Sequence, residues 1–153
     1  MDRADIQIRW MVRTDLDDAT RILRSVGEED TERRLNSLLE RPSVMCVVAE
    51  IKKEVVGVAI YDIGRVSKIK ILSLAVDEPR RRKGAGKSLV SEIFLKLNKK
   101  RNKVEASVSE YGLPAHLFLK SLGFKAVAVL AGAGGTSEYK FLYKPSDSSK
   151  EEA

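Results

Sequence analysis

Hydrophobic residues recur along this chain with two alternating periods, and each period predicts a different kind of element. At the N-terminus Ile6, Ile8 and Trp10 alternate with polar residues, which is typical of a strand with one buried face. Similar alternating or β-branched runs predict further strands at 44–51, 55–63, 68–76, 104–109, 124–130 and 138–143. The polar turn at 52–54 joins the first two of these runs, so we expect a hairpin there.

Apolar residues three or four positions apart predict four helices between the strands. Their apolar stripes are Ala19, Ile22, Leu23 and Val26; Leu35, Leu38 and Leu39; Leu89, Val90, Ile93, Phe94 and Leu97, which we expect to be buried; and Ala115, Phe118, Leu119 and Leu122. Thr14 or Asp15 can cap the first helix, and Gly123 ends the fourth. A hairpin that leads into strand–helix–strand units predicts an α/β fold, with a central mixed sheet of about seven strands flanked by helices on both faces.

Length and composition are those of one ordinary domain. The chain has 153 residues, 43% hydrophobic and 33% charged, which supplies enough apolar material for a core and argues against disorder. We expect a single domain over residues 1–144 and a polar tail at 145–153. The N-terminal segment is polar, and no apolar run approaches the roughly 18 residues that span a membrane. A cytoplasmic protein without a membrane partner is therefore expected.

Cysteine and histidine each occur once, as Cys46 and His116. This excludes a disulfide within the chain and a cysteine-based metal cluster, and we expect no metal. A zinc site or a Ser-His-Asp triad would depend on His116 alone. Cys46 lies in the middle of a predicted strand and is interpreted as a core residue, whereas His116 is expected to face solvent.

Positive charge is concentrated in the middle of the chain. The net charge is +6, yet residues 65–103 alone hold 13 lysines and arginines against three acidic residues. Such a segment suggests a locally bound polyanion, either nucleic acid or a phosphorylated cofactor, and a solvated basic helix face is the third possibility. Aromatic residues make up 6% of the chain and do not interleave with the basic run, which argues against a stacking platform for nucleic acid.

The turn between the strand ending at Val76 and the next helix has the composition of an anion site. The helix opens with Gly84, Ala85 and Gly86, small residues that allow a ligand to touch the backbone. Free N–H groups at a helix start, together with the helix dipole, form a cradle for an anion. The cations around this turn that add charge to the cradle are Arg81, Lys83 and Lys87.

Two common nucleotide motifs do not fit this turn. A P-loop requires glycine where this chain has Arg81, although Gly86-Lys87-Ser88 imitates its ending. A dinucleotide fingerprint requires a third glycine where this chain has Leu89. The turn therefore needs another explanation.

The run Arg81-Arg82-Lys83-Gly84-Ala85-Gly86 resembles the acetyl-CoA signature of the GNAT acyltransferase superfamily, Arg/Gln-x-x-Gly-x-Gly/Ala. A second block, from Ala115 to Phe124, is similar to the family pattern Ala-x-x-x-aromatic-x-x-x-Gly-Phe. The order of elements over residues 5–144 also matches. Within the superfamily the chain most resembles the ribosomal-protein alanine N-acetyltransferases, through residues 8–15, 74–76 and 123–127.

This resemblance implies an N-acetyltransferase that moves an acetyl group from acetyl-CoA to a primary amine, with a protein N-terminus as the acceptor that the subgroup suggests. It also implies that the strand ending at Val76 splays from its neighbour and offers backbone groups to the thioester and to the oxyanion. The residues it assigns to coenzyme A are Leu74, Ala75, Val76, Arg81, Arg82, Lys83, Gly84, Ala85, Gly86, Lys87 and Ser88.

The chain departs from the family at the positions of the catalytic acid and base. Ser107 replaces the glutamate on the fifth strand, and Leu119 replaces the tyrosine that protonates the thiolate. Glu105 lies about 7 Å from the place of the missing glutamate and is our candidate base, acting through water, with a solvated strand-end glutamate as the alternative. Tyr111 is our candidate acid. Weak activity is therefore expected.

Two other functions stay open at this point. One is a degenerate member of the fold that binds coenzyme A without efficient catalysis, because the binding residues are kept while the acid and base are not. The other is a module that binds nucleic acid or the ribosome through the basic segment at 65–103.

Overall fold

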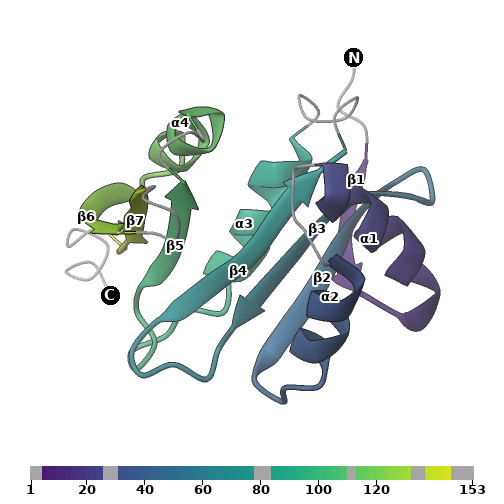
Figure 1. Ribbon diagram of the computed structural model, residues 1–153, viewed down its shortest axis with the longest axis horizontal. Helices are drawn as coiled ribbons and strands as arrows, with labels where there is room; N and C mark the ends of the chain where they lie inside the picture. Colours follow the sequence, from purple (N-terminus) through teal and green to yellow (C-terminus); the bar gives the residue numbers. More distant parts are fainter. Residues whose placement is uncertain (1–4, 26–30, 78–83, 110–112, 132–136, 146–153) are drawn as a thin grey trace. The chain divides into compact units, whose positions relative to one another are not determined.

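The computed structural model describes residues 5–25, 31–77, 84–109, 113–131 and 137–145 (Figure 1). The predicted order of strands and helices is confirmed, with one short 3-10 turn, η1, added before the first helix. The elements are β1 (Ile6–Trp10), η1 (Arg13–Asp15), α1 (Leu16–Ser25), α2 (Thr31–Leu39), β2 (Val44–Ile51), β3 (Glu54–Asp62), β4 (Ile69–Val76), α3 (Ala85–Phe94), β5 (Val104–Ser109), α4 (Leu113–Ser121), β6 (Lys125–Ala131) and β7 (Ser137–Tyr143).

The strands form one seven-stranded mixed sheet, as predicted, and their order is β1-β2-β3-β4-β5-β7-β6. β4 and β5 run parallel, with Ile69 opposite Val104 and Lys70 opposite Glu105. A parallel pair needs a crossover connection, and α3 supplies it. β1 with β2, β2 with β3, β5 with β7 and β6 with β7 are antiparallel pairs.

The predicted hairpin is formed by β2 and β3. Ile51 lies opposite Glu54, so the connection has only two residues, Lys52 and Lys53. Both have positive φ, 51° and 66°, which is the conformation of the tight turns whose twist matches paired strands. Glycine and asparagine are the usual residues in this conformation, but here both positions are lysine. The pairing of β2 with β3 therefore outweighs the conformational free energy that positive φ costs the two lysines.

Contacts divide the chain into two compact units. The first unit comprises residues 1–64 and 72–96, and the second comprises residues 65–71 and 97–153. The single domain expected over 1–144 stays a prediction, and residues 146–153 of the expected tail lie outside the described part of the chain.

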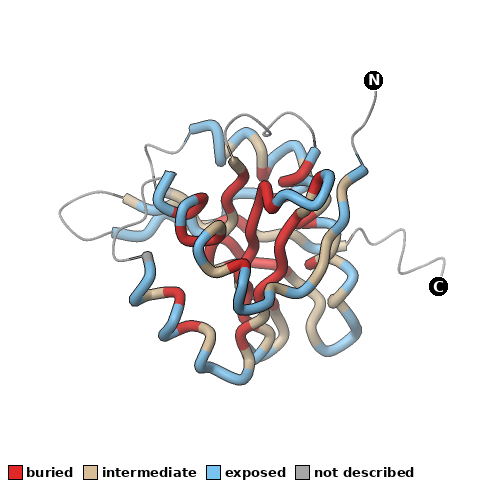
Figure 2. Tube along the Cα trace, turned by 90° about the vertical axis from the view of Figure 1, so that its right-hand side faces the viewer, coloured by how far each residue is buried: buried red, intermediate tan, exposed pale blue. Residues whose placement is uncertain are grey.

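The core of the first unit lies between α1 and α2 on one side and β2 and β3 on the other. Its buried side chains come from the stripes that the helical spacing predicted and from one face of the hairpin; Figure 2 shows the buried residues gathered inside the trace. The members are Ala19, Ile22, Leu23, Leu35, Leu38, Val44, Cys46, Val48, Val55, Val58, Ile60 and Ala75. The core position predicted for Cys46 is thereby confirmed.

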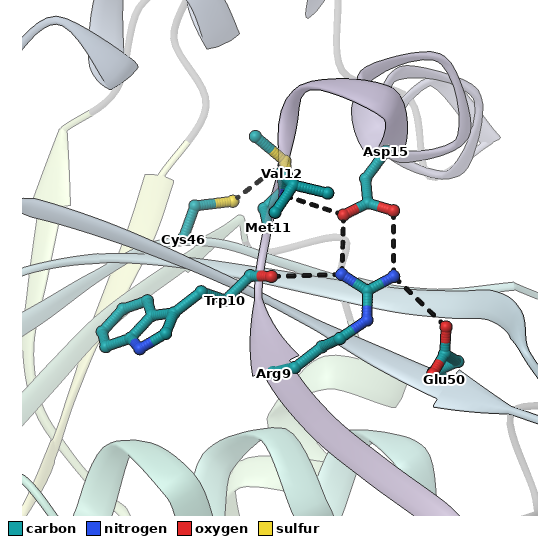
Figure 3. Close-up of polar contacts among 7 residues, drawn as sticks. All are labelled: Arg9, Trp10, Met11, Val12, Asp15, Cys46 and Glu50. Carbon is teal, nitrogen blue, oxygen red and sulfur yellow. Dashed lines mark hydrogen bonds and ion pairs between the residues drawn. The ribbon is translucent and has the colours of Figure 1, made fainter.

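A charged cluster fixes the junction between β1 and α1 (Figure 3). Arg9 donates two hydrogen bonds to the carboxylate of Asp15, at 2.8 and 3.0 Å, and one to Glu50 at 3.2 Å. The same carboxylate accepts the N–H of Val12 at 2.8 Å, so Asp15 closes the turn of η1 that precedes α1. The hydrogen bond from Arg9 outweighs burial and holds the pKa of Asp15 below its usual value.

The third predicted helix is shorter than expected. We predicted that its buried stripe extends to Leu97, but α3 ends at Phe94 and Leu95 is 76% exposed. The side-chain oxygen of Asn98 accepts the N–H groups of Lys100 and Arg101, at 2.9 and 2.8 Å. Asparagine thus offers the backbone a turn in place of further helix, which the apolar spacing alone could not show.

Candidate cofactor and active site

The phosphate turn predicted from the sequence opens α3 in a left-handed conformation. Gly84 is the N-cap residue of α3, with φ of 87°, and its carbonyl accepts the N–H of Ser88 at 3.0 Å. This conformation costs a residue with a side chain roughly 1–2 kcal/mol, which explains the glycine. The first N–H groups of a helix have no partner within it, so they are available to an anion.

Among the described residues, one contact is found where a side chain on Gly84 would lie. A Cβ placed on Gly84 would have Ile6 Cδ1, at 3.7 Å, as its nearest neighbour, which is an ordinary contact. Ala85 and Gly86 are buried, while Lys87 is exposed and Ser88 half-buried. An anionic group could therefore accept hydrogen bonds from the backbone that follows Gly84 and lie near the ammonium group of Lys87.

The end of β4 lies against α3 because of a glycine in the neighbouring strand. A Cβ on Gly57 of β3 would lie 3.1 Å from Leu89 Cδ1 and 3.3 Å from the carbonyl oxygen of Ala75. A side chain at Gly57 would crowd both the Leu89 side chain of α3 and the Ala75 carbonyl of β4. We did not single out Gly57, although an isolated glycine inside a β-branched run signals such an approach.

The structure places the predicted coenzyme A residues in two described segments. Leu74, Ala75 and Val76 end β4, where Leu74 is half-buried and the other two are buried. The turn residues Gly84, Ala85, Gly86, Lys87 and Ser88 form the N-terminal end of α3. Arg81, Arg82 and Lys83 lie outside the described residues, as does Tyr111.

An arginine that the sequence analysis missed holds β4 just before this segment. Arg34 of α2 donates to the hydroxyl of Ser73 at 2.6 Å and to the carbonyl of Leu72 at 3.1 Å. Ser73 is only 5% exposed. A serine inside the apolar run of β4 was the available signal, because a buried hydroxyl needs a hydrogen-bond partner.

Glu105 is buried and paired with two lysines of the second unit. It is 4% exposed, and its carboxylate lies 2.6 Å from Lys68 Nζ and 3.4 Å from Lys140 Nζ. Burial opposes ionisation, but the hydrogen bonds and charges of the two lysines outweigh it, so the pKa of Glu105 is lowered. The alternative interpretation as a solvated glutamate is wrong. A carboxylate with a lowered pKa is a weaker base, which weighs against a catalytic role.

The aromatic side chains of the second unit pack on α4. The ring of His116 lies 5.0 Å from that of Tyr139 and 5.1 Å from that of Phe141, in edge-to-face contacts. The expectation that His116 faces solvent is therefore wrong, because the histidine is half-buried against β7. Leu119, which stands in place of the family tyrosine, is 4% exposed and belongs to the core of this unit.

A hollow of about 570 Å³ lies elsewhere in the first unit, between the β1–α1 junction and α2. Its lining residues are Met11, Val12, Arg13, Leu16, Asn36 and Leu39. No predicted site residue is among the described residues that line it.

The model of the acetyltransferase (GNAT) family matches residues 10–124. This chain belongs to the GNAT family. The match covers β4, the phosphate turn and α3. GNAT family proteins use acetyl-CoA as co-substrate. No curated protein matches the sequence significantly.

Solved GNAT structures share the whole fold. The chain is similar to Ard1 from Thermoplasma volcanium, with 24% identity over 91% of this chain and 97% of that one, and a TM-score of 0.80. It is also similar to the ribosomal-protein-S18-alanine N-acetyltransferase from Escherichia coli, with 18% identity, coverage of 92% and 94%, and a TM-score of 0.78. NAA60 from Arabidopsis thaliana, solved in complex with a bisubstrate analogue, has 19% identity over 92% of this chain and 98% of that one, with a TM-score of 0.78. Ribosomal-protein alanine N-acetyltransferases, the predicted subgroup, are thus among the similar folds.

Among the residues that the structure describes, no helix is long and apolar enough to cross a membrane.

Proposed function

We propose that this GNAT protein transfers the acetyl group of acetyl-CoA to a primary amine, and that its acceptor is a protein N-terminus. The left-handed Gly84, which opens α3 after β4, is the observation that carries the proposal. The cradle at Gly84, Ala85 and Gly86 would hold the pyrophosphate of acetyl-CoA through backbone N–H groups. Arg81, Arg82, Lys83 and Lys87 would supply the neighbouring positive charge.

The names of similar proteins support this acceptor class. The Escherichia coli protein is named for the alanine of ribosomal protein S18, and the Brucella melitensis protein for ribosomal-protein alanine. Both share the fold of this chain over most of its length, with TM-scores of 0.78 and 0.76. An N-terminal amine is also the easier primary amine to use, since its pKa of about 8 lies more than two units below that of lysine.

The chain's contribution to the reaction is mainly positioning. Transfer forms a C–N bond to the acceptor amine and breaks the C–S bond of the thioester. Backbone groups at Leu74, Ala75 and Val76 would orient the acetyl group and stabilise the negative charge that develops on its carbonyl oxygen. The departing thiolate has a conjugate acid with a pKa of about 8.5, so it leaves without the tyrosine that Leu119 replaces.

The rate of transfer is expected to rise with pH, because the acceptor amine loses its proton to solvent rather than to a tuned protein base. Acetyl transfer to peptides that begin with alanine or serine, and to the same peptides with a blocked N-terminus and a free lysine, should be followed from about pH 6 to 10. We expect transfer to the free N-termini, with a rate that rises through the pKa of the N-terminal amine, about 8, and levels off above it because the amine is then fully deprotonated. Acetyl-CoA should also raise the melting temperature, since a ligand that binds only the native state stabilises it.

A bell-shaped profile centred near neutrality would contradict this mechanism and show that a protein acid and base exist. Transfer to the lysine peptide alone would contradict the N-terminal acceptor. Absence of a melting shift with a folded chain at millimolar acetyl-CoA would overturn the site itself.

Arg34 is expected to be a positioning residue for the same strand. Arg34→Met removes the hydrogen bonds from Arg34 to the buried Ser73 hydroxyl and to the Leu72 carbonyl, beside the segment that would hold the thioester. At about 1–3 kcal/mol for an unsatisfied buried group, we expect kcat/KM to fall roughly tenfold or more, with Arg34→Lys intermediate. Arg33→Met, an exposed arginine on the same helix, is the control and should act like the wild type. Equal kinetics for both methionine variants would exclude the role.

A second candidate function is binding of coenzyme A without efficient catalysis. Glu105 held by two lysines and Leu119 placed in the core favour it, because neither side chain can serve as base or acid in this arrangement. Tight binding of acetyl-CoA by calorimetry, with no transfer to any amine in a single-turnover assay, would favour this candidate over the first.

A further inference from the structure

The outermost strand of the second unit, β6, is apolar and exposed along its length. It lies at the end of the sheet order, beside β7 (Figure 1). Every residue of β6 is exposed except Ala128, which is half-buried. Val127, Val129 and Leu130 are 53%, 58% and 47% exposed. Apart from Lys125 at its start, the strand carries no charge.

An exposed apolar edge of this kind is unusual for a strand that pairs with no further strand on its outer side. An edge strand presents a row of unpaired N–H and C=O groups, and proteins normally protect it with charges, prolines or short length. β6 has seven residues, the last six of which are alanine, valine or leucine. Its protective features among the described residues are Lys125 at its start and the register shift between Ala126 and Ala128, which makes Val127 a bulge.

We propose that β6 is the contact surface for a second copy of this chain, and that the two β6 strands pair antiparallel across a two-fold axis. Two identical strands can satisfy each other's edge groups only in a symmetric way, because a two-fold contact uses the same patch on both copies. The result is a continuous sheet through both copies, built by backbone hydrogen bonds between β6 and β6.

The faces of β6 are compatible with a register in which Lys125 pairs with Leu130 of the second copy. Lys125 lies opposite Leu142, and Leu130 lies opposite Glu138, so Lys125 and Leu130 point to one face of the sheet. Ala126 and Val129 lie opposite Phe141 and Tyr139 and so point to the other face. Paired residues must share a face. Pairing Lys125 with Leu130 of the second copy, and Ala126 with its Val129, meets this condition on both sides of the bulge.

Charge complementarity supports the same register. Glu138 of β7 stands beside Leu130, on the face that carries Lys125. In the proposed pair, Lys125 therefore faces Glu138 of the second copy across two strand spacings, roughly 9.5 Å between backbones, which the two long side chains can bridge. The two-fold axis makes this contact twice. Among the described residues neither Lys125 nor Glu138 has an ionic partner in its own chain.

Light scattering after size exclusion tests the pairing. The wild-type chain should elute with twice its mass of 17.0 kDa, and Val129→Lys should elute with that mass once, because a lysine side chain opposes the exposed apolar face at the centre of the contact. Val66→Lys is the matched control, since Val66 is an 89% exposed valine of the same unit outside β6. A monomeric wild type at the highest soluble concentration, or a dimer that Val129→Lys leaves intact, would overturn the proposal.

Exchange of charge tests the register. Lys125→Glu places two carboxylates together at each end of the contact, and we expect the dimer dissociation constant to rise about tenfold. Glu138→Lys alone should have a similar effect, and the double variant should return to the wild-type value. Acetyl-CoA melting shifts confirm that each variant is folded. If the double variant dimerises as weakly as the two single changes predict when their losses of binding free energy are added, the antiparallel register is wrong.

Discussion

Replacement of Gly84 by valine is expected to weaken acetyl-CoA binding about 100-fold while the chain remains folded. Gly84 has φ of 87°, which a β-branched residue adopts only at a cost of roughly 1–2 kcal/mol. Relief of this strain would turn the first peptide groups of α3 away from the cradle. A hydrogen bond to a charged oxygen contributes about 1.5–3 kcal/mol, so the loss of one or two donors accounts for the expected change. Calorimetric titration measures it.

Gly84→Asn is the matched control, because asparagine tolerates positive φ far better than valine. The turn has room for it, since the nearest atom to a Cβ at this position is Ile6 Cδ1 at 3.7 Å. We expect the asparagine variant to keep most of the affinity. If both variants lose it with unchanged melting temperatures, the ligand itself must touch the glycine. If valine binds as tightly as the wild type, the pyrophosphate lies elsewhere.

Replacement of Glu105 by alanine is expected to lower the melting temperature by roughly 6–12 °C without abolishing acetyl-CoA binding. The change leaves Lys68 and Lys140 facing each other without the buried carboxylate that joins them. Breaking a buried ion pair costs about 3 kcal/mol or more, and each kcal/mol shifts the midpoint of a chain of this size by about 2–4 °C. Differential scanning calorimetry gives the midpoint. Lys140→Ala, which removes the longer of the two contacts, should have a smaller effect.

The contribution of Glu105 to stability should depend on pH in one direction. Its pKa is lowered in the folded chain, so the folded state favours the ionised carboxylate. The stabilisation is therefore fully present above the usual carboxyl pKa of about 4.3 and is lost as the pH falls through the lower folded value. Denaturant unfolding of the wild type and Glu105→Gln should differ most near neutral pH, and the difference should shrink with acid. A constant difference would exclude this linkage.

The same variant decides whether Glu105 is also the base that the sequence analysis suggested. A buried carboxylate held by two ammonium groups accepts a proton poorly, so we expect Glu105→Gln to keep kcat within several-fold at a temperature where it is folded. A fall of 100-fold or more, the loss expected for a true general base, would instead assign Glu105 to catalysis.

Much of the fold could be predicted because strand and helix periods are properties of short segments. The runs at 44–51 and 104–109 coincide with β2 and β5, and Gly123 follows α4 with φ of 97°. The phosphate turn could also be predicted, since its chemistry depends on consecutive residues. The position at which a helix ends was harder to predict from residue spacing. After α3 the apolar spacing continues, but the side chain of Asn98 accepts backbone N–H groups and forms a turn instead.

Contacts between distant segments could not be predicted. The strand period placed Glu105 on the polar face of β5, but only the folded sheet shows that Lys68 and Lys140 converge on its carboxylate from other strands. Arg34 is likewise separated from Ser73 by 38 intervening positions, and nothing in the helix pattern distinguishes it from Arg33. Burial of a polar side chain depends on what stands opposite it, and a single sequence does not contain that information.

The native cysteine of this protein, Cys46, is expected to react only slowly with thiol reagents. It is the single cysteine, it lies 7% exposed in β2, and burial raises the pKa of its thiol to about 12. At pH 7 about one molecule in 100,000 therefore carries a thiolate there, against roughly 3% for an exposed thiol with a pKa near 8.5. A cysteine introduced at Val66, which is 89% exposed, would react with a maleimide about a thousand times faster. Fluorescent or spin labels can thus be attached at one chosen surface position without first removing the native thiol.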